Sequence, residues 1–169
     1  MARSAWVSDD TMSHVLAALM PVNRLAIICS MLTGLRIGDV LSLRASCLQK
    51  ERFIVTEQKT LKKRHVRLPS KLREELLKIS GRVYVFEHRT DPLRHRSRQA
   101  VYKDIRRAAL AFRIRDRLSP HSARKIYAVR EYKKDFNIQR VKSLLNHSNE
   151  AVTLIYALAD QLTERKKRG

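Results

Sequence analysis

The chain has 169 residues and is 44% hydrophobic, which fits one compact domain with a single core. Its 36 Lys and Arg residues outnumber 16 Asp and Glu residues, and the resulting net charge of +20 predicts a polyanionic partner. The longest apolar stretch, around 25–32, is too short for a transmembrane helix, so the charge favours nucleic acid over a membrane.

Two further observations concern compartment and metal. The first ten residues, MARSAWVSDD, lack the apolar segment of a secretory signal, so we expect a cytoplasmic protein. Cys29 and Cys47 lie among apolar residues without CxxC spacing. We therefore expect buried, reduced thiols and no metal site.

The first half of the chain begins with two helices. Asp9 or Asp10 is positioned to cap the first helix, whose apolar residues recur at helical spacing and which we expect to end at Pro21. The second helix, from about Val22 to Leu32, is apolar on nearly all sides and is expected at the centre of the core. Gly34 then allows a left-handed turn that ends it.

The segment TGLRIGDVLSLR, residues 33–44, follows this turn. Asp39 lies three residues after Arg36, close enough to orient its guanidinium in a helix. Taken alone, Arg36 is more simply interpreted as a surface or ion-paired arginine.

A β-hairpin is predicted next, with strands at 53–58 and 63–69 and lysines at its tip. The preceding residues Ala45 to Leu48 are a candidate third strand. By itself, Lys59 at the tip is most simply a charge that keeps the hairpin soluble.

Helices return after the hairpin. One begins at Pro69 and closes at Gly81, and another begins near Ser97. In the helix that begins near Ser97, the side chains expected to face the core are Val101, Ile105, Ala108 or Ala109, and Phe112.

The last part of the chain carries the remaining candidate residues. Ser119 and Pro120 begin a helix on which His121 and Arg124 share one face near the N-terminal end, where backbone N–H groups favour anions. A short helix follows and ends near Asn146, which tolerates a left-handed cap. Tyr156 lies on the apolar stripe of a final helix, where a packed tyrosine is the usual interpretation. The elements together predict a mainly α fold with a small antiparallel β-sheet (α+β).

In combination, these segments resemble the catalytic domain of the tyrosine recombinases, the phage integrase family. TGLRIGDVLSLR is similar to the family's first arginine box, EQKTLKKRHVRLP to its lysine hairpin, HSAR to its His-x-x-Arg motif and LLNHSNEAVTLIY to its closing box. The resemblance implies six catalytic residues, which are Arg36, Lys59, His121, Arg124, His147 and Tyr156.

The resemblance implies a reaction in which Tyr156 attacks a scissile DNA phosphate and forms a 3′-phosphotyrosyl link, with no metal or other cofactor. It also implies double-stranded DNA as partner, a tetramer on DNA and a nucleoid-associated, cytoplasmic location. Basic residues expected to bind DNA are Lys62, Lys63, Arg64, Arg96, Arg98, Lys103, Arg106 and Lys125.

The expected domain organisation is one catalytic domain over residues 1–169, without the N-terminal DNA-clamping domain of most family members. Two alternatives within the same resemblance are a non-catalytic DNA-binding regulator of recombinase fold and a type IB topoisomerase-like enzyme. Equal biological activity of wild type and Tyr156→Phe favours the regulator. Relaxation of plasmids without site preference favours the topoisomerase-like enzyme.

Overall fold

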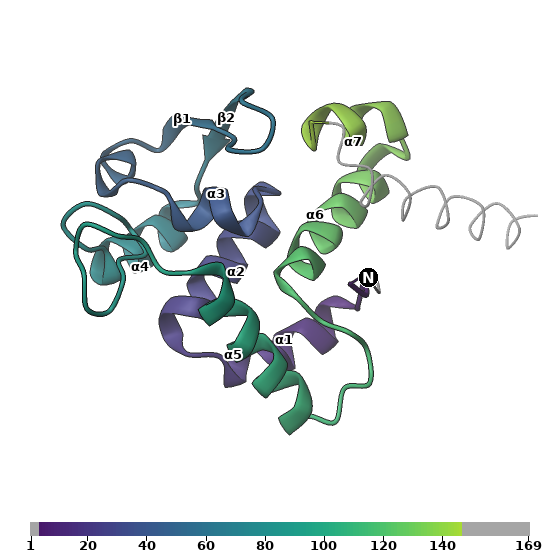
Figure 1. Cartoon of the computed structure of the whole chain (residues 1–169). Helices are drawn as coiled ribbons and strands as arrows, with labels where there is room; N and C mark the ends of the chain where they lie inside the picture. Colours follow the sequence, from purple (N-terminus) through teal and green to yellow (C-terminus); the bar gives the residue numbers. More distant parts are fainter. Residues whose placement is uncertain (1–3, 147–169) are drawn as a thin grey trace, which may run out of the picture.

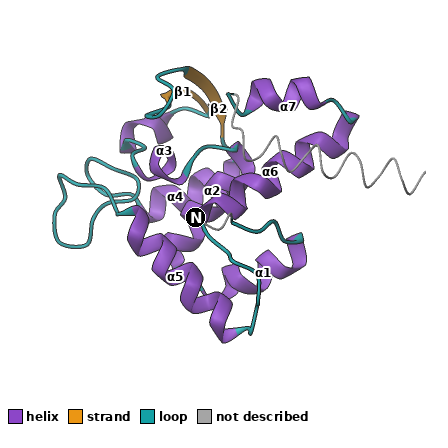
Figure 2. Ribbon diagram, turned by 45° about the vertical axis from the view of Figure 1, so that its right-hand side comes forward, coloured by secondary structure: helices purple, strands orange, loops and turns teal. Residues whose placement is uncertain are grey.

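A computed structural model describes residues 4–146 and has a mainly helical architecture with a two-stranded antiparallel sheet (Figure 1). The sheet and α7 lie towards one end of the molecule, and α1 and α5 lie towards the other (Figures 1 and 2). The elements are α1 (Asp9–Ala18), α2 (Pro21–Thr33), α3 (Ile37–Leu41), the 3₁₀ helix η1 (Ala45–Gln49), β1 (Arg52–Thr56), β2 (Lys63–Arg67), α4 (Ser70–Ile79), α5 (Arg98–Ala111), α6 (Pro120–Asp135) and α7 (Ile138–Leu144). The predicted fold class is confirmed.

Helix α2 forms the centre of the core, as its apolar sequence predicts. It packs against α1, α3, α4 and α6. Leu25, Ala26, Ile27 and Cys29 are all buried. Because apolar burial is the main favourable term in folding, this helix is the framework on which the other elements are placed.

The turn between α2 and α3 lies within the segment TGLRIGDVLSLR and determines the position of Arg36. Gly34 has a φ of 67°, in the left-handed region predicted for it. A Cβ at this position would collide with the ring of Tyr127 on α6, so the close approach of α6 also requires glycine. The Ser30 hydroxyl donates to the Leu35 carbonyl at 2.8 Å and closes the turn. As a result, Arg36 is the N-cap residue of α3.

The predicted hairpin is confirmed. Its strands pair in an antiparallel register that places Thr56 opposite Lys63 next to the turn. Val55 and Val66 are buried on the face that meets the core, while their neighbours along each strand are more exposed. Leu61, with a φ of 54°, provides the left-handed residue that reverses the chain.

Helix α6 begins as its sequence predicts. The Ser119 hydroxyl accepts a hydrogen bond from the His121 backbone N–H. Ser119 and Ser122 also form a capping box, in which each side chain accepts from the backbone N–H of the other. The helix packs along α2. Helix α7 then ends near Asn146, whose φ of 48° confirms the predicted left-handed cap.

Three local predictions are wrong. The N-cap of α1 is Ser8, which accepts a hydrogen bond from the Thr11 N–H, and not Asp9 or Asp10, which lie in the first turn. The segment proposed as a third strand is the 3₁₀ helix η1, because its backbone makes local bonds such as Cys47 N–H to the Arg44 carbonyl and Leu48 anchors it in the core. Phe112 is 45% exposed, although its helical spacing predicts an inward position. Phe112 is the C-cap of α5, so its backbone is no longer helical and the helical spacing does not apply to it.

Both cysteines are free thiols, as predicted, but only Cys29 is buried, whereas Cys47 is half-buried. Burial raises the pKa of Cys29 to about 12, so this thiol is an inert part of the core. Within residues 4–146, no helix is both long and apolar enough to cross a membrane. The same residues contain no cluster of three or more His, Cys, Asp or Glu side chains suited to a metal ion.

Candidate active site

Arg36 meets the hairpin directly after the turn that ends α2. Its Nη1 donates to Oε2 of Glu57 at 2.6 Å, and its side chain is 17% exposed. Glu57 directly follows β1 and is fully buried. The arginine at the start of α3 is therefore attached to the hairpin through a nearly dry ion pair.

The Glu57 carboxylate binds further donors besides Arg36. Its Oε2 accepts from the Thr60 hydroxyl at 3.0 Å, and its Oε1 lies 3.4 Å from Nη1 of Arg64. Burial acts to raise the pKa of Glu57, but the Thr60 hydrogen bond and the charges of Arg124 and Arg36 outweigh it and lower the pKa. Glu57 is thus held as a carboxylate.

Arg124 comes to the same place from the first turns of α6. It is only 4% exposed, and its Nη2 donates to the Leu145 carbonyl at 2.7 Å. Its Nε and Nη1 have no hydrogen-bond partner within the part of the chain that the structure describes. Burial, followed by the charge of Arg36, lowers the pKa of Arg124 to about 10. The guanidinium is still charged at neutral pH, and two of its nitrogens are suited to donate to an anion.

Asp39 has a different role from the predicted one. Its Oδ1 accepts from the Gln58 backbone N–H at 2.9 Å, and its buried Oδ2 has no partner among the described residues. The carboxylate that hydrogen-bonds Arg36 is Glu57. Burial raises the pKa of Asp39, and the charge of Glu57 adds to this effect. Asp39 therefore anchors the hairpin backbone to α3, because its own helix directs it towards Gln58.

Arg64 fastens β2 to the end of α2. Its guanidinium donates to the carbonyls of Thr33 and Gly34, and it lies 5.8 Å from the centre of the Tyr127 ring. Its side chain is 10% exposed. This residue, predicted to bind DNA, has its charged group directed into the protein beside Glu57.

Lys59 and His121 are both exposed. Lys59 lies in the hairpin turn, two residues after Glu57, and His121 lies in the first turn of α6, one turn before Arg124. The structure thus brings Arg36 and Arg124 within electrostatic reach of each other, with the hairpin turn that bears Lys59 joined to Arg36 through Glu57. His147 and Tyr156 lie outside the described residues.

The other residues predicted to bind DNA differ in their surroundings. Lys62, Lys63, Arg98 and Lys103 are exposed, and Arg106 is half-buried. Arg96 donates through Nε to Asn23 at 2.6 Å. Lys125 is buried, and its ammonium donates to the Ser4 carbonyl. Contact of any of these residues with DNA stays a prediction.

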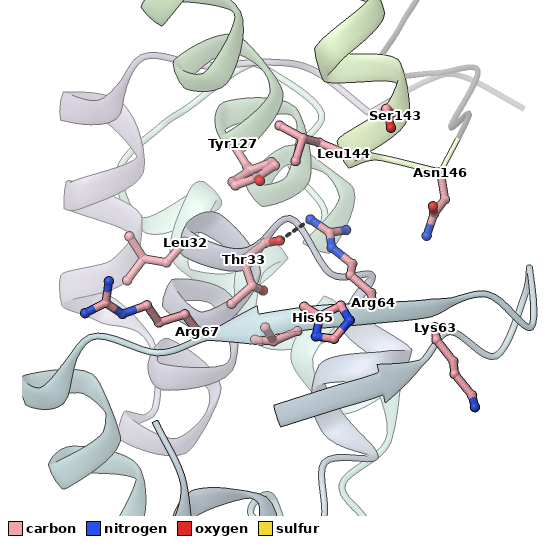
Figure 3. A pocket seen from close by; sticks show the side chains of 11 residues that line it. Leu32, Thr33, Lys63, Arg64, His65, Arg67, Tyr127, Ser143, Leu144 and Asn146 are labelled. Carbon is pink, nitrogen blue, oxygen red and sulfur yellow. Dashed lines mark hydrogen bonds between the residues drawn. The ribbon is translucent and has the colours of Figure 1, made fainter. Parts of the chain in front are cut away.

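A cavity of about 410 Å³ adjoins this cluster between β2, the end of α2, α6 and α7 (Figure 3). Lys63, Arg64 and His65 from β2 form one wall, and Tyr127 and Asn146 lie on the opposite side. Arg64 is the residue that the cavity shares with the ion pairs around Glu57. Arg36 and Arg124 do not line it.

Glu57 is the member of this cluster that sequence reasoning missed. A signal for it was present, because side chains two apart on a strand share a face and Val55 is an obvious core residue. A carboxylate continuing that buried face requires a cationic partner. Arg36 and Arg64 are those partners.

Solved structures with the same arrangement of elements define the class of fold. The crystal structure of XerA recombinase matches with a TM-score of 0.68 at 22% identity, covering 98% of this chain and 66% of that one. The catalytic domain of bacteriophage HP1 integrase matches with a TM-score of 0.67 at 21% identity, covering 94% and 88%. A lambda integrase dimer bound to a COC′ core site gives 0.71 at 22% identity, covering 92% and 60%. The fold is that of tyrosine recombinase catalytic domains.

Sequence comparison then gives the family. The model of the phage integrase family matches residues 6–162, and the chain belongs to this family. A probable integrase/recombinase, YoeC, of Bacillus subtilis is 30% identical over 137 residues, which are 79% of this chain and 75% of YoeC. A tyrosine recombinase of Thermosipho africanus is 29% identical over 167 residues. The chain covers 58% of the length of that second relative.

Proposed function

We propose that this chain carries out site-specific recombination of double-stranded DNA through a covalent intermediate on Tyr156. The observation that carries the proposal is a deeply buried Arg124 whose Nε and Nη1 have no partner among the described residues, with Arg36 near enough for its charge to add to burial in lowering the pKa of Arg124. Two guanidiniums repel each other, and an anion between them relieves that repulsion. A phosphodiester is an anion that guanidinium groups bind bidentately.

The proposed reaction divides phosphoryl transfer into two reversible steps. The Tyr156 hydroxyl oxygen attacks the scissile phosphorus and forms a bond to it, while the bond from phosphorus to the 5′-oxygen breaks. The phosphate stays attached to the 3′-oxygen. Lys59 gives its proton to the departing 5′-oxygen, and His121 assists removal of the tyrosine proton. A 5′-hydroxyl of another strand then reverses these steps and restores a phosphodiester, so the bond energy is retained.

Charge stabilisation is assigned to the remaining residues. Arg36 and Arg124 bind the non-bridging oxygens, and His147 donates to one of them as negative charge develops. Removing one such donor from an enzyme commonly slows the reaction by a factor of about 10²–10³. These roles for the six residues rest on the family's motif order together with the positions of Arg36 and Arg124.

The partner proposed is duplex DNA, which suits a chain of net charge +20. Among the structural neighbours is a lambda integrase tetramer bound to a Holliday junction. By analogy, we propose that this chain also assembles into a tetramer on DNA, in the cytoplasm where the nucleoid lies. The assignment of residues 1–169 to one catalytic domain stays a prediction, since the chain covers 44% to 75% of its curated relatives.

The test begins with a library of randomised duplexes, each with a nick that lets a short cleaved fragment leave. Full-length protein is incubated with the library, and SDS-resistant protein–DNA adducts are recovered and sequenced. We expect one enriched sequence with wild type and no adduct with Tyr156→Phe. Absence of an adduct with wild type, or an adduct that persists in Tyr156→Phe, contradicts the proposal.

A further inference from the structure

We propose that Glu57 is a positioning residue of the recombination site, which sets the Arg36 guanidinium in place and joins it to the hairpin turn that carries Lys59. The inference rests on the proposed function for its effect on cleavage. It concerns the first residue of the hairpin segment EQKTLKKRHVRLP, which is not one of the six residues given a catalytic role, and it stands on the contacts of the buried carboxylate.

The Glu57 carboxylate has a well-defined geometry. Both oxygens of Glu57 receive donors, with Arg36 Nη1 at 2.6 Å and Thr60 Oγ1 at 3.0 Å on Oε2, and Arg64 Nη1 at 3.4 Å from Oε1. The side chain is inaccessible to solvent. A charge-assisted bond of this length in a dry site restricts the rotamers of Arg36 far more than an exposed ion pair does.

Glu57 also balances positive charge. The charges of Arg36 and Arg64 both act on Arg124, so three guanidiniums share one small region. Glu57 makes direct contact with two of them and favours the charged form of the third. Asp39 also favours the charged form of Arg124, with a smaller effect than Glu57. Without an anion, such a group of cations is unfavourable in a poorly solvated place. Glu57 therefore acts as a built-in counter-ion that keeps the arginines together before DNA arrives.

Glu57 is also connected to the turn that carries Lys59. The backbone of Glu57 closes the hairpin turn through two bonds, its N–H donating to the Lys62 carbonyl at 3.0 Å and its carbonyl accepting from the Leu61 N–H at 2.8 Å. Its side chain binds Thr60, the residue directly after Lys59. Glu57 thus closes the turn through its backbone and orients the Arg36 guanidinium through its side chain. The proposed general acid and the proposed phosphate ligand are placed relative to each other through it.

The test compares wild type, Glu57→Gln and a matched control, Glu51→Gln, on full-length protein. Glu51 lies next to the same hairpin and pairs with Arg67 at 2.6 Å, but both side chains are exposed. The first readout is the rate of adduct formation at saturating concentration of the duplex selected with wild type. The second is the affinity for that duplex, and the third is thermal stability in low millimolar sodium sulfate against sodium chloride of equal ionic strength.

For Glu57→Gln we expect adduct formation to slow by about 10²-fold, as misplacement of catalytic groups commonly does. Affinity for DNA should be unchanged or tighter, because one negative charge near the phosphate site is lost. Sulfate should raise the melting temperature of this variant more than that of wild type or Glu51→Gln, since it replaces the missing anion. A purely structural role lowers the folded fraction and does not produce this combination.

An adduct rate within about threefold of wild type overturns the proposal, and so does a rate loss matched by an equal loss of affinity. An equal sulfate effect in all three proteins overturns the counter-ion role. If Glu57→Gln is unfolded in chloride, recovery of folding in sulfate supports that role. If Glu57→Gln stays unfolded in sulfate, Glu57→Asp is tested in its place. Its side chain keeps the negative charge but is one methylene shorter, so its oxygens lie farther from Arg36. Adduct formation by Glu57→Asp at the wild-type rate overturns the proposal.

Failure of the proposed function has a different signature. In that case wild type itself forms no Tyr156-dependent adduct, whereas the sulfate comparison needs no DNA and still decides the counter-ion role of Glu57.

Discussion

Two buried carboxylates in this molecule have similar donors and different surroundings. Asp104 on α5 accepts from the Met20 N–H at 2.9 Å, the Asn23 amide at 2.7 Å and the Arg107 guanidinium at 2.6 Å. Glu57 also binds arginine, but beside it Arg124 has two buried nitrogens without partners within residues 4–146. The Asp104 cluster is complete in itself, as structural polar groups usually are.

The difference between the two clusters distinguishes a structural polar cluster from one that binds a ligand. Around Asp104, the buried Asn23 is also satisfied on its other side, by the Arg96 Nε at 2.6 Å. Around Glu57, three arginines lie near two carboxylates, those of Glu57 and Asp39, and two nitrogens of Arg124 have no acceptor within residues 4–146. Unsatisfied buried donors cost free energy, and a protein tolerates them where a ligand satisfies them.

The largest expected effect is that of Arg124→Gln on catalysis. Loss of a donor aimed at the developing negative charge should slow adduct formation by about 10²–10³-fold, measured on the selected duplex. Stability in urea should be unchanged or higher, because a buried charge with unsatisfied nitrogens has been removed.

The matched control is Arg130→Gln, which changes an arginine on the same helix that pairs with Asp9 at 2.7 Å near the surface. We expect it to cleave at close to the wild-type rate. If Arg124→Gln and Arg130→Gln lose the same factor in rate, the distinction between an open and a complete cluster is wrong.

The second prediction concerns Asp104→Ala. This change leaves the buried Asn23 amide and the Met20 N–H without their acceptor, and we expect a loss of about 3 kcal/mol in unfolding free energy. Urea denaturation measures it, with the exposed Asp9→Ala as control at less than about 1 kcal/mol. The folded fraction of Asp104→Ala should still form the adduct at the wild-type rate. A specific loss of rate would give Asp104 a function in the site.

The third prediction is acid sensitivity. Burial raises the pKa of both Glu57 and Asp104, but their hydrogen bonds and ion pairs outweigh it and leave both values lowered in the folded state. Their stabilisation is present above the ordinary values of 4.5 and 3.8 and is lost as pH falls through the lower folded values. Unfolding free energy should therefore decrease below about pH 4.5, with a smaller slope in Glu57→Gln. An unchanged slope in that variant contradicts the ion-pair assignment.

The smallest effect is expected from Asp39→Asn. Burial raises the pKa of Asp39, so at neutral pH the folded protein disfavours its charge, and a neutral amide should change stability by less than about 1 kcal/mol, towards greater stability. The Asn carbonyl oxygen still accepts from the Gln58 N–H. Because the folded pKa is raised, the stability advantage of Asn should shrink as pH falls through it. Urea denaturation at several pH values measures this, and a large loss at neutral pH would show that Asp39 is needed as an anion.

Much of the fold followed from local sequence signals. Ser119 and Pro120 determine the start of α6, and Gly34 and Asn146 adopt left-handed conformations that few other residues accept. Such signals depend on a residue and its immediate neighbours. The η1 helix was missed because a short segment satisfies strand and 3₁₀ preferences almost equally, and contacts with the core decide between them.

The site was less accessible to sequence reasoning for a related reason. Arg36 and Asp39 are neighbours on one helix, which made Asp39 the natural partner from spacing alone. The true partner, Glu57, lies 21 positions away from Arg36 and reaches it only because the hairpin folds over the start of α3. Partners far apart in sequence depend on tertiary packing, which helical spacing does not describe.

The most direct test of the central claim is the chemical identity of the adduct. Mass spectrometry of the proteolysed, nuclease-trimmed complex should find a nucleotide linked through its 3′-phosphate to the peptide that contains Tyr156, with a 5′-hydroxyl on the released strand. Attachment at another residue, or through a 5′-phosphate, would contradict the account.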